Sequence, residues 1–225
     1  MTVLLVLFTF ITFLLIDYFR TRKTTAHPIM ELAAMEHETA PRLQPALVAG
    51  FQVPENLRYH PGHTWALSES PNLVRVGLDD FASKLTGTAK SITLPRLGQW
   101  IRQGQKMCTI HRDGCTADMV SPIEGTVAEI NPALATDPKL ALRDPYGEGW
   151  LVTVQAPDAK TSFRNLLSGP LARWWTEESA NRLQRRIPTA LAGALAQDGG
   201  VAMNNVTTRI PDQDWLPLAK EFFLS

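Results

Sequence analysis

The chain has 225 residues, 44% of them hydrophobic, and its 22 basic and 22 acidic side chains give a formal net charge of zero. This size and apolar content suit one globular domain with extensions at its ends. The balanced charge argues against a nucleic-acid-binding protein, because such a protein needs a basic face to offset phosphate.

The N-terminal segment is apolar and ends in a basic flank. Residues 1–16 contain no charged side chain, and Asp17 is followed by three cations, Arg20, Arg22 and Lys23. About 19 residues of helix span about 28 Å, close to the thickness of one hydrocarbon core. A signal peptide carries its positive charges before the apolar run, so the reversed order favours an uncleaved anchor. We therefore expect residues 3–19 to span a membrane once, with 1–23 as the anchor and its flank and the C-terminal domain in the cytoplasm.

Residues 24–56 are interpreted as a linker. Four prolines interrupt this stretch: Pro28, Pro41, Pro45 and Pro54. One helical piece is predicted within it, around Ile29–Glu36.

Residues 57–156 are predicted to form the ordered domain. Short β-type runs recur there, separated by Gly, Pro and Asn: Thr64–Leu67, Leu73–Leu78, Ser91–Leu94, Lys106–His111, Cys115–Val120, Thr126–Ile130 and Trp150–Gln155. One short helix is expected between two of these strands, at Asp79–Leu85. The spacing is typical of a small barrel or sandwich, so the fold class is mainly β, with little room for a deep substrate cavity.

A β-hairpin is predicted with Asp113-Gly114 as its turn. Asp-Gly between two alternating runs favours a type I′ turn, which needs a positive φ at both central residues. In that register Arg112 faces Cys115 and Cys108 faces Met119, so the two cysteines do not meet. We expect two thiols and no disulfide, as is usual in the cytoplasm.

Residues 157–225 are predicted to be a helical C-terminal extension. Helical patterns run through 161–186, and an amphipathic piece at 215–225 is expected to begin with Pro217 in its first turn. Trp174 and Trp175, among several arginines, have two interpretations. They lie on an anionic membrane leaflet or dock a partner, or they pack on the domain with the arginines solvated. The same alternatives apply to three further aromatic residues, Trp215, Phe222 and Phe223.

Four segments, together with the hairpin, resemble the H protein of the glycine cleavage system. They read LRYHPGHTW (57–65), VRVGLDDFA (74–82), SPIEGTVAEINPAL (121–134) and DPKLALRDPYGEGWL (137–151). The most specific part is the turn made of Asp144, Pro145, Tyr146, Gly147, Glu148, Gly149 and Trp150. Pro and two glycines predict a tight surface turn there, after which Trp150 fills the core. The resemblance implies a barrel-sandwich hybrid fold of the lipoyl/biotinyl type.

The resemblance also implies a lipoylated lysine at the hairpin tip, whose arm carries an aminomethyl group between partner enzymes. Counted back from Pro122 with the family spacing, the lysine position falls on Gly114. The aspartate that the family places four residues later is Asp118, and the acidic residue usual three before is His111. Because lipoate joins through an amide, Gly114 cannot accept it, and the nearest lysine of the hairpin is Lys106. We therefore expect no cofactor at this tip.

The candidate contact residues of the tip are Arg112, Asp113, Gly114 and Cys115. Cys115 is interpreted as a half-buried strand residue rather than as a reactive thiol, because nothing nearby guarantees a lowered pKa. His60 and His63 are interpreted as structural, since no cysteine or carboxylate pair completes a metal site. No metal, no small-molecule substrate and no catalytic constellation are expected, so the chain is not predicted to be an enzyme.

Three functions follow, in order of preference. The first is a membrane-anchored, non-lipoylated H-like adaptor or scaffold for protein partners of a membrane-associated complex. The alternative is an H-type carrier with a lipoyl group elsewhere or a thiol-linked group on Cys115. The second alternative is an adaptor of the membrane-fusion type, although the hairpin lacks the long coiled-coil insertion of such proteins.

Overall fold

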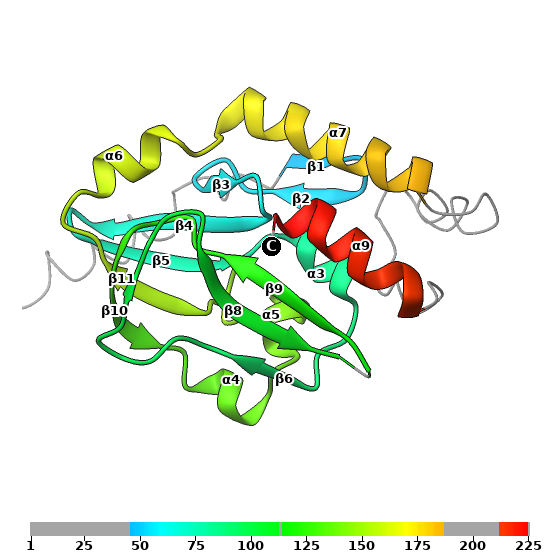
Figure 1. Cartoon of the computed structure of the whole chain (residues 1–225). Helices are drawn as coiled ribbons and strands as arrows, with labels where there is room; N and C mark the ends of the chain where they lie inside the picture. Colours follow the sequence, from blue (N-terminus) through cyan, green and yellow to red (C-terminus); the bar gives the residue numbers. More distant parts are fainter. Residues whose placement is uncertain (1–45, 113, 187–211, 225) are drawn as a thin grey trace, which may run out of the picture. The chain divides into compact units, whose positions relative to one another are not determined.

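A computed structural model describes residues 46–112, 114–186 and 212–224, which all lie within the unit Gln44–Ser225 (Figure 1). Its body is built from β-strands, and the helices that follow in the chain pack on that body. The predictions for residues 3–19 and Ile29–Glu36 lie outside the described residues. Within the described part, none of the helices combines the length and the apolar character that crossing a membrane requires.

The larger sheet has six antiparallel strands in the order β3-β4-β5-β11-β10-β7. Their bounds are Arg58–His60 (β3), Thr64–Ser70 (β4), Leu73–Leu78 (β5), Val152–Gln155 (β11), Gly125–Ile130 (β10) and Trp100–Ile101 (β7). Trp65 on β4 lies opposite Gly77 on β5, and a Cβ on Gly77 would lie 2.4 Å from the indole ring. The glycine therefore makes room for a tryptophan that is only 1% exposed.

A three-stranded sheet in the order β6-β8-β9 forms the second layer of the body. Its strands are Ser91–Thr93 (β6), Lys106–His111 (β8) and Thr116–Val120 (β9). Buried side chains from both sheets, among them Val76, Ile110 and Met119, belong to the same hydrophobic core. The predicted mainly β body is thus confirmed for residues 58–155.

Three short helices lie within the body, α3 (Asp80–Thr86), α4 (Ala133–Thr136) and α5 (Leu140–Arg143). Asp79 caps α3, because its Oδ1 accepts a hydrogen bond from the Ala82 amide at 2.7 Å. The buried Lys84 of α3 donates to Asp80 Oδ2 at 2.7 Å and to the Gly50 carbonyl at 3.0 Å. These bonds tie α3 to the hairpin of β1 (Ala46–Val48) and β2 (Phe51–Val53). That hairpin falls inside residues 24–56, the stretch interpreted as a linker, and it belongs to the same unit as the body.

The C-terminal part forms α6 (Ala159–Arg164), α7 (Gly169–Arg186) and α9 (Asp212–Phe223). In Figure 1, α7 runs over β1 and β2, and α9 runs beside β9. The placement of Pro217 in a first helical turn was wrong, because α9 begins at Asp212 and Pro217 lies inside it. Proline removes one backbone hydrogen bond there, and burial of Trp215, Leu218 and Phe222 offsets the loss.

Candidate functional site

The tip of the β8–β9 hairpin has the predicted register. Cys108 pairs with Met119 and His111 with Thr116, and the Arg112 amide donates to the Cys115 carbonyl at 2.8 Å. Gly114 has φ = 78°, in the region that a type I′ turn demands and that glycine adopts without strain. Asp113 lies outside the described residues. The strands follow one another without an insertion, which disfavours the membrane-fusion type of adaptor.

Helix α9 lies against this hairpin. Trp215 is 2% exposed and its indole Nε1 donates to the Thr116 carbonyl of β9 at 3.2 Å. The guanidinium carbon of Arg112 lies 4.2 Å from the centre of the Trp215 ring, a cation–π distance. One predicted contact residue of the tip is therefore engaged by the chain's own C-terminal helix.

A buried histidine links the helices to the body. His63 is 0% exposed, and its Nδ1 lies 2.7 Å from Asp79 Oδ2. Its ring stacks between Phe81 (4.1 Å) and Trp175 (4.4 Å). No described residue hydrogen-bonds its Nε2. Aromatic rings rather than nucleophilic side chains surround this pair, which agrees with the predicted structural role.

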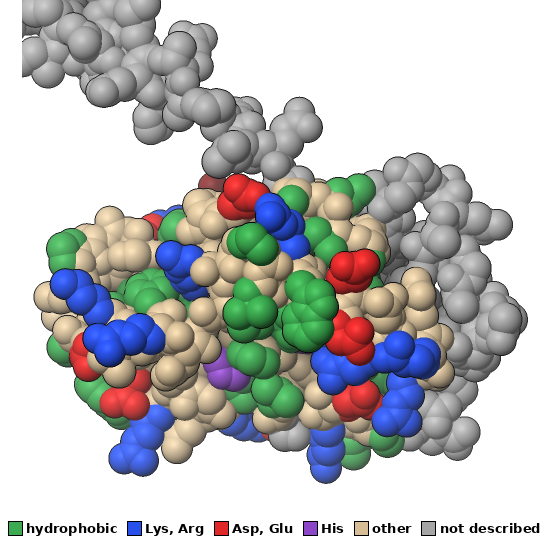
Figure 2. Space-filling view, turned by 90° about the horizontal axis from the view of Figure 1, so that it is seen from above, with side chains coloured by type: hydrophobic (Ala, Val, Ile, Leu, Met, Phe, Trp, Pro, Cys, Tyr) green, Lys and Arg blue, Asp and Glu red, His purple; other side chains and the backbone are tan. Residues whose placement is uncertain are grey.

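The two tryptophans of α7 have different environments. Trp175 packs on His63, whereas Trp174 is 62% exposed and Leu171, one turn earlier, is 54% exposed. Figure 2 views the face on the side of α7 and shows hydrophobic side chains near its middle, with charged side chains around them. The packed interpretation is therefore confirmed for Trp175, whereas contact of Trp174 with a membrane or a partner stays a prediction. Trp215, Phe222 and Phe223 are all buried.

Two lysines bear on the chemistry of the hairpin. Lys106, at its base, forms an ion pair with Asp118 at 2.7 Å. Partial burial raises the pKa of Asp118, but hydrogen bonds from Lys106 and Thr109 outweigh it, so the pKa is lowered overall.

Lys90 was missed by the sequence reasoning, although its amide donates to the His111 carbonyl at 2.8 Å, near the tip. Only the pairing of β6 with β8 brings Lys90 there, and nothing in the local sequence signals that pairing.

The two cysteines are in no disulfide, and Cys108 is buried whereas Cys115 is partly buried. Burial, followed by the negative charge of Asp118, raises the pKa of the Cys108 thiol to about 12. Cys108 is therefore protonated at neutral pH and unreactive.

The turn of residues 144–150 holds three parts of the body together. Asp144 Oδ2 accepts from the Glu148 amide at 2.8 Å, and the Pro145 carbonyl accepts from Trp65 Nε1 at 3.0 Å. The Tyr146 hydroxyl donates to the Gln52 carbonyl at 2.7 Å and accepts from the Asp80 amide at 2.9 Å. A Cβ on Gly149 would lie 2.4 Å from the Leu140 carbonyl oxygen, and Trp150 is 9% exposed. The turn therefore has a structural role, because its hydrogen bonds join β4, the β1–β2 hairpin and α3.

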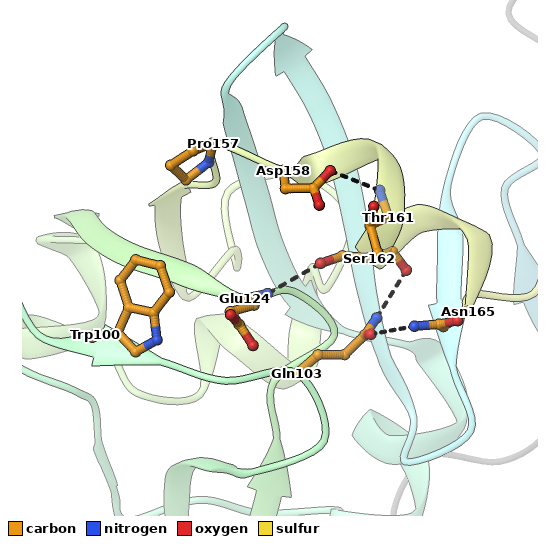
Figure 3. A pocket seen from close by; sticks show the side chains of 8 residues that line it. All are labelled: Trp100, Gln103, Glu124, Pro157, Asp158, Thr161, Ser162 and Asn165. Atoms are coloured by element: carbon orange, nitrogen blue, oxygen red, sulfur yellow. Dashed lines mark hydrogen bonds between the residues drawn. The ribbon is translucent and has the colours of Figure 1, made fainter.

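A polar recess of about 330 Å³ lies at the base of the hairpin, near α6 (Figure 3). Gln103 Nε2 donates to the Ser162 carbonyl at 2.9 Å, and Gln103 Oε1 accepts from Asn165 Nδ2 at 2.7 Å. The Trp100 ring, 52% exposed, forms the opposite wall. The hydrogen bonds among Gln103, Ser162 and Asn165 satisfy these polar groups and hold α6 on the body. Among the described residues, no three His, Cys, Asp or Glu side chains converge as metal ligands do.

The family model and the curated relatives agree on one family. The family model described as glycine cleavage H-protein matches residues 57–177. The glycine cleavage system H protein of Mycobacterium avium (strain 104) is 35% identical over 107 residues, which cover 48% of this chain and 81% of that protein. That of Xanthomonas euvesicatoria pv. vesicatoria (strain 85-10) is 34% identical over 116 residues, 52% of this chain and 88% of the relative. A crystal structure of an H protein from Mycobacterium marinum aligns with a TM-score of 0.48 and 27% identity, covering 56% of this chain and 98% of that chain.

Proposed function

The chain belongs to the glycine cleavage H-protein family, and from that membership we propose that it is a non-lipoylated member that serves as an adaptor. In this proposal Gly114 takes the position of the lysine that the family lipoylates. The H-type domain keeps its contacts with protein partners but transfers no group. It is accordingly not an enzyme and binds no cofactor at the hairpin tip.

The hairpin tip is the observation that carries the proposal. Gly114 offers no amine, and Arg112 beside it lies over the buried Trp215. The amine of Lys106 is at the other end of the strand, ion-paired with Asp118. A ligase that acylates an exposed apical lysine therefore finds no such group at this apex.

The proposal includes a membrane tether. Residues 3–19 are apolar and a basic flank follows them, which supports a single-pass anchor with the remaining chain in the cytoplasm. The proposed organisation is an anchor at 1–23, a linker that leads from residue 24 to the β1–β2 hairpin, the H-type domain that ends at 156 and a helical extension at 157–225. The partners would then be subunits of a complex on the same membrane.

Co-purification in mild detergent tests the adaptor role. The tagged full chain should leave the membrane fraction together with at least one other subunit at near-equal molar amounts. The matched control is the same chain with residues 1–23 removed, which should be recovered without detergent. A full chain that elutes from native membranes as a lone monomer would contradict the adaptor role. Recovery of the full chain without detergent would contradict the tether.

A carrier with its group on another side chain is the second candidate. It is favoured by the position of Lys90, whose backbone pairs with His111 near the tip, and by the partial exposure of Cys115. Peptide mapping of the native protein separates the two candidates. An acyl group on Lys90 or Cys115 supports the carrier, and unmodified peptides at both positions support the adaptor.

A further inference from the structure

A second recess, of about 630 Å³, lies between the β3–β4 edge of the large sheet and α6. Three of its lining residues are cations, Arg58, Lys160 and Arg164, and all three are exposed. Its apolar lining includes Leu67, Phe163 and Leu166, which are partly or fully buried. The recess therefore combines a cationic rim with an apolar floor.

The fold brings the cations together from two separate elements. Lys160 and Arg164 stand four residues apart on α6, so they share one face of the helix. Arg58 comes from β3, and the neighbouring Tyr59 exchanges backbone hydrogen bonds of 2.9 and 2.8 Å with Leu167, just after α6. On its other side, α6 is held by the bond from Asn165 to Gln103 (Figure 3). The cations thus stand on a rigid frame.

The positive charge of this rim is not neutralised within the described part of the chain. None of the residues lining the recess is a carboxylate, and no described Asp or Glu forms an ion pair with any of the three cations. Elsewhere on the surface Arg75, Arg173 and Arg185 each have a carboxylate partner. Like charges four apart on a helix destabilise it, so Lys160 and Arg164 lack the usual compensation.

We propose that this recess docks an acidic segment of a partner protein, in which a carboxylate is flanked by an apolar side chain. The two guanidinium groups suit a carboxylate, which each can bind through paired N–H donors. Exposed ion pairs in water contribute little, so a bare anion would be held weakly. An apolar side chain that covers Leu67 and Phe163 adds burial and removes water from the charged contacts. The inference rests on the proposed adaptor function and names the chemistry of its partner.

Fluorescence anisotropy with labelled peptides tests the proposal on the full chain in detergent. The probe is a peptide EELFEEL, compared with QQLFQQL, which lacks the charge, and EEGSEEG, which lacks the apolar side chains. The first should bind, and each of the others should bind about tenfold more weakly. The double variant Arg58→Ala/Arg164→Ala should also weaken EELFEEL about tenfold.

The matched control removes two exposed arginines outside the recess, Arg96 and Arg102. The variant Arg96→Ala/Arg102→Ala should change the affinity less than about twofold, because distant charges are screened by salt. An equal loss in both double variants would overturn the proposal in favour of non-specific attraction. Equal binding of EELFEEL and EEGSEEG would also overturn it, because the apolar floor would then contribute nothing. Failure here leaves the modification state of the hairpin tip, and hence the proposed function, separately measurable.

Discussion

At the residue scale, the difference between a lipoyl carrier and a non-lipoylated protein depends on position 114 at the hairpin tip. Gly114 takes a positive φ that a side chain would strain by about 1–2 kcal/mol. The residue thus favours a tight turn and supplies no amine at the position where the family carries its lysine. This strain is small compared with the free energy of unfolding of an ordinary domain, so the fold would tolerate a lysine with a positive φ at this position. The amine is absent because the residue is glycine, not because the fold excludes lysine.

Gly114→Lys should therefore create a substrate for lipoate–protein ligase. We expect the variant to gain one lipoyl group when incubated with ligase, ATP and lipoate, and the natural chain to gain none. Intact mass after incubation is the readout. Gly114→Arg is the matched control, because it brings the same φ strain and charge without an amine that can be acylated. Lipoylation of the natural chain or of Gly114→Arg would show that another lysine is the target.

Asp79 combines two structural roles, as the cap of α3 and as the partner of His63. Asp79→Ala should lower the free energy of unfolding by roughly 3 kcal/mol, because it removes the cap and leaves a buried imidazole nitrogen unpaired. Urea denaturation measures the change. Asp158→Ala is the control, since Asp158 caps the short helix α6 at an exposed position, where its Oδ1 accepts from the Thr161 amide at 3.3 Å. This variant should lower the free energy of unfolding by only about 0.5 kcal/mol. Equal losses would show that the His63 contact contributes nothing.

At the scale of elements, α9 is joined to both the hairpin and α7. Trp215 bonds to Thr116 of β9, and Glu221 forms an ion pair with Arg186 of α7 at 2.8 Å. Phe222 packs on Phe81 of α3, with ring centres 5.2 Å apart. The helix therefore packs on the face of the body that carries Phe81.

Trp215→Ala should destabilise the chain by about 3 kcal/mol, because it removes a fully buried ring together with its hydrogen bond. Hydrogen exchange of the β9 amides should speed up as α9 detaches. The control is Leu216→Ala on the same helix, whose side chain is 51% exposed and should change stability by less than about 0.5 kcal/mol. Unchanged exchange in Trp215→Ala would contradict the docking of α9 on the hairpin.

Elements with a strong local pattern were predictable, and those set by distant partners were not. β5 and β8 begin and end where their alternating runs do, and the Asp-Gly turn gave the correct partner for Cys108. β7, with only two residues, exists because it pairs with β10, which no local pattern reveals. The stacking of His63 on Trp175 likewise joins residues more than a hundred positions apart. The cationic recess depends on the same kind of long-range placement.

At the scale of the whole molecule, stability should depend on pH through His60. Burial, and then the charge of His63, lowers the pKa of His60 below its usual 6.5. The folded chain therefore binds a proton here less readily than the unfolded chain does. The free energy of unfolding should be full above about pH 6.5 and should decline as the pH falls below it.

His60→Asn should flatten this decline, because asparagine does not titrate. In the natural chain, His60 Nδ1 accepts a hydrogen bond from the Gly62 amide at 3.0 Å. The asparagine side chain keeps an acceptor for that amide. Thermal unfolding between pH 7.5 and 5 measures the effect. The unfolding temperature of the natural chain should drop over this range more than that of the variant. Parallel curves would assign the pH dependence to other groups.

The account as a whole depends on whether this family member carries a group. Intact mass spectrometry of the full chain, isolated from the cells that naturally make it, measures this most directly. We predict the mass of the unmodified polypeptide. An increase equal to one lipoyl or octanoyl group, at any residue, would contradict the account and make the chain a carrier.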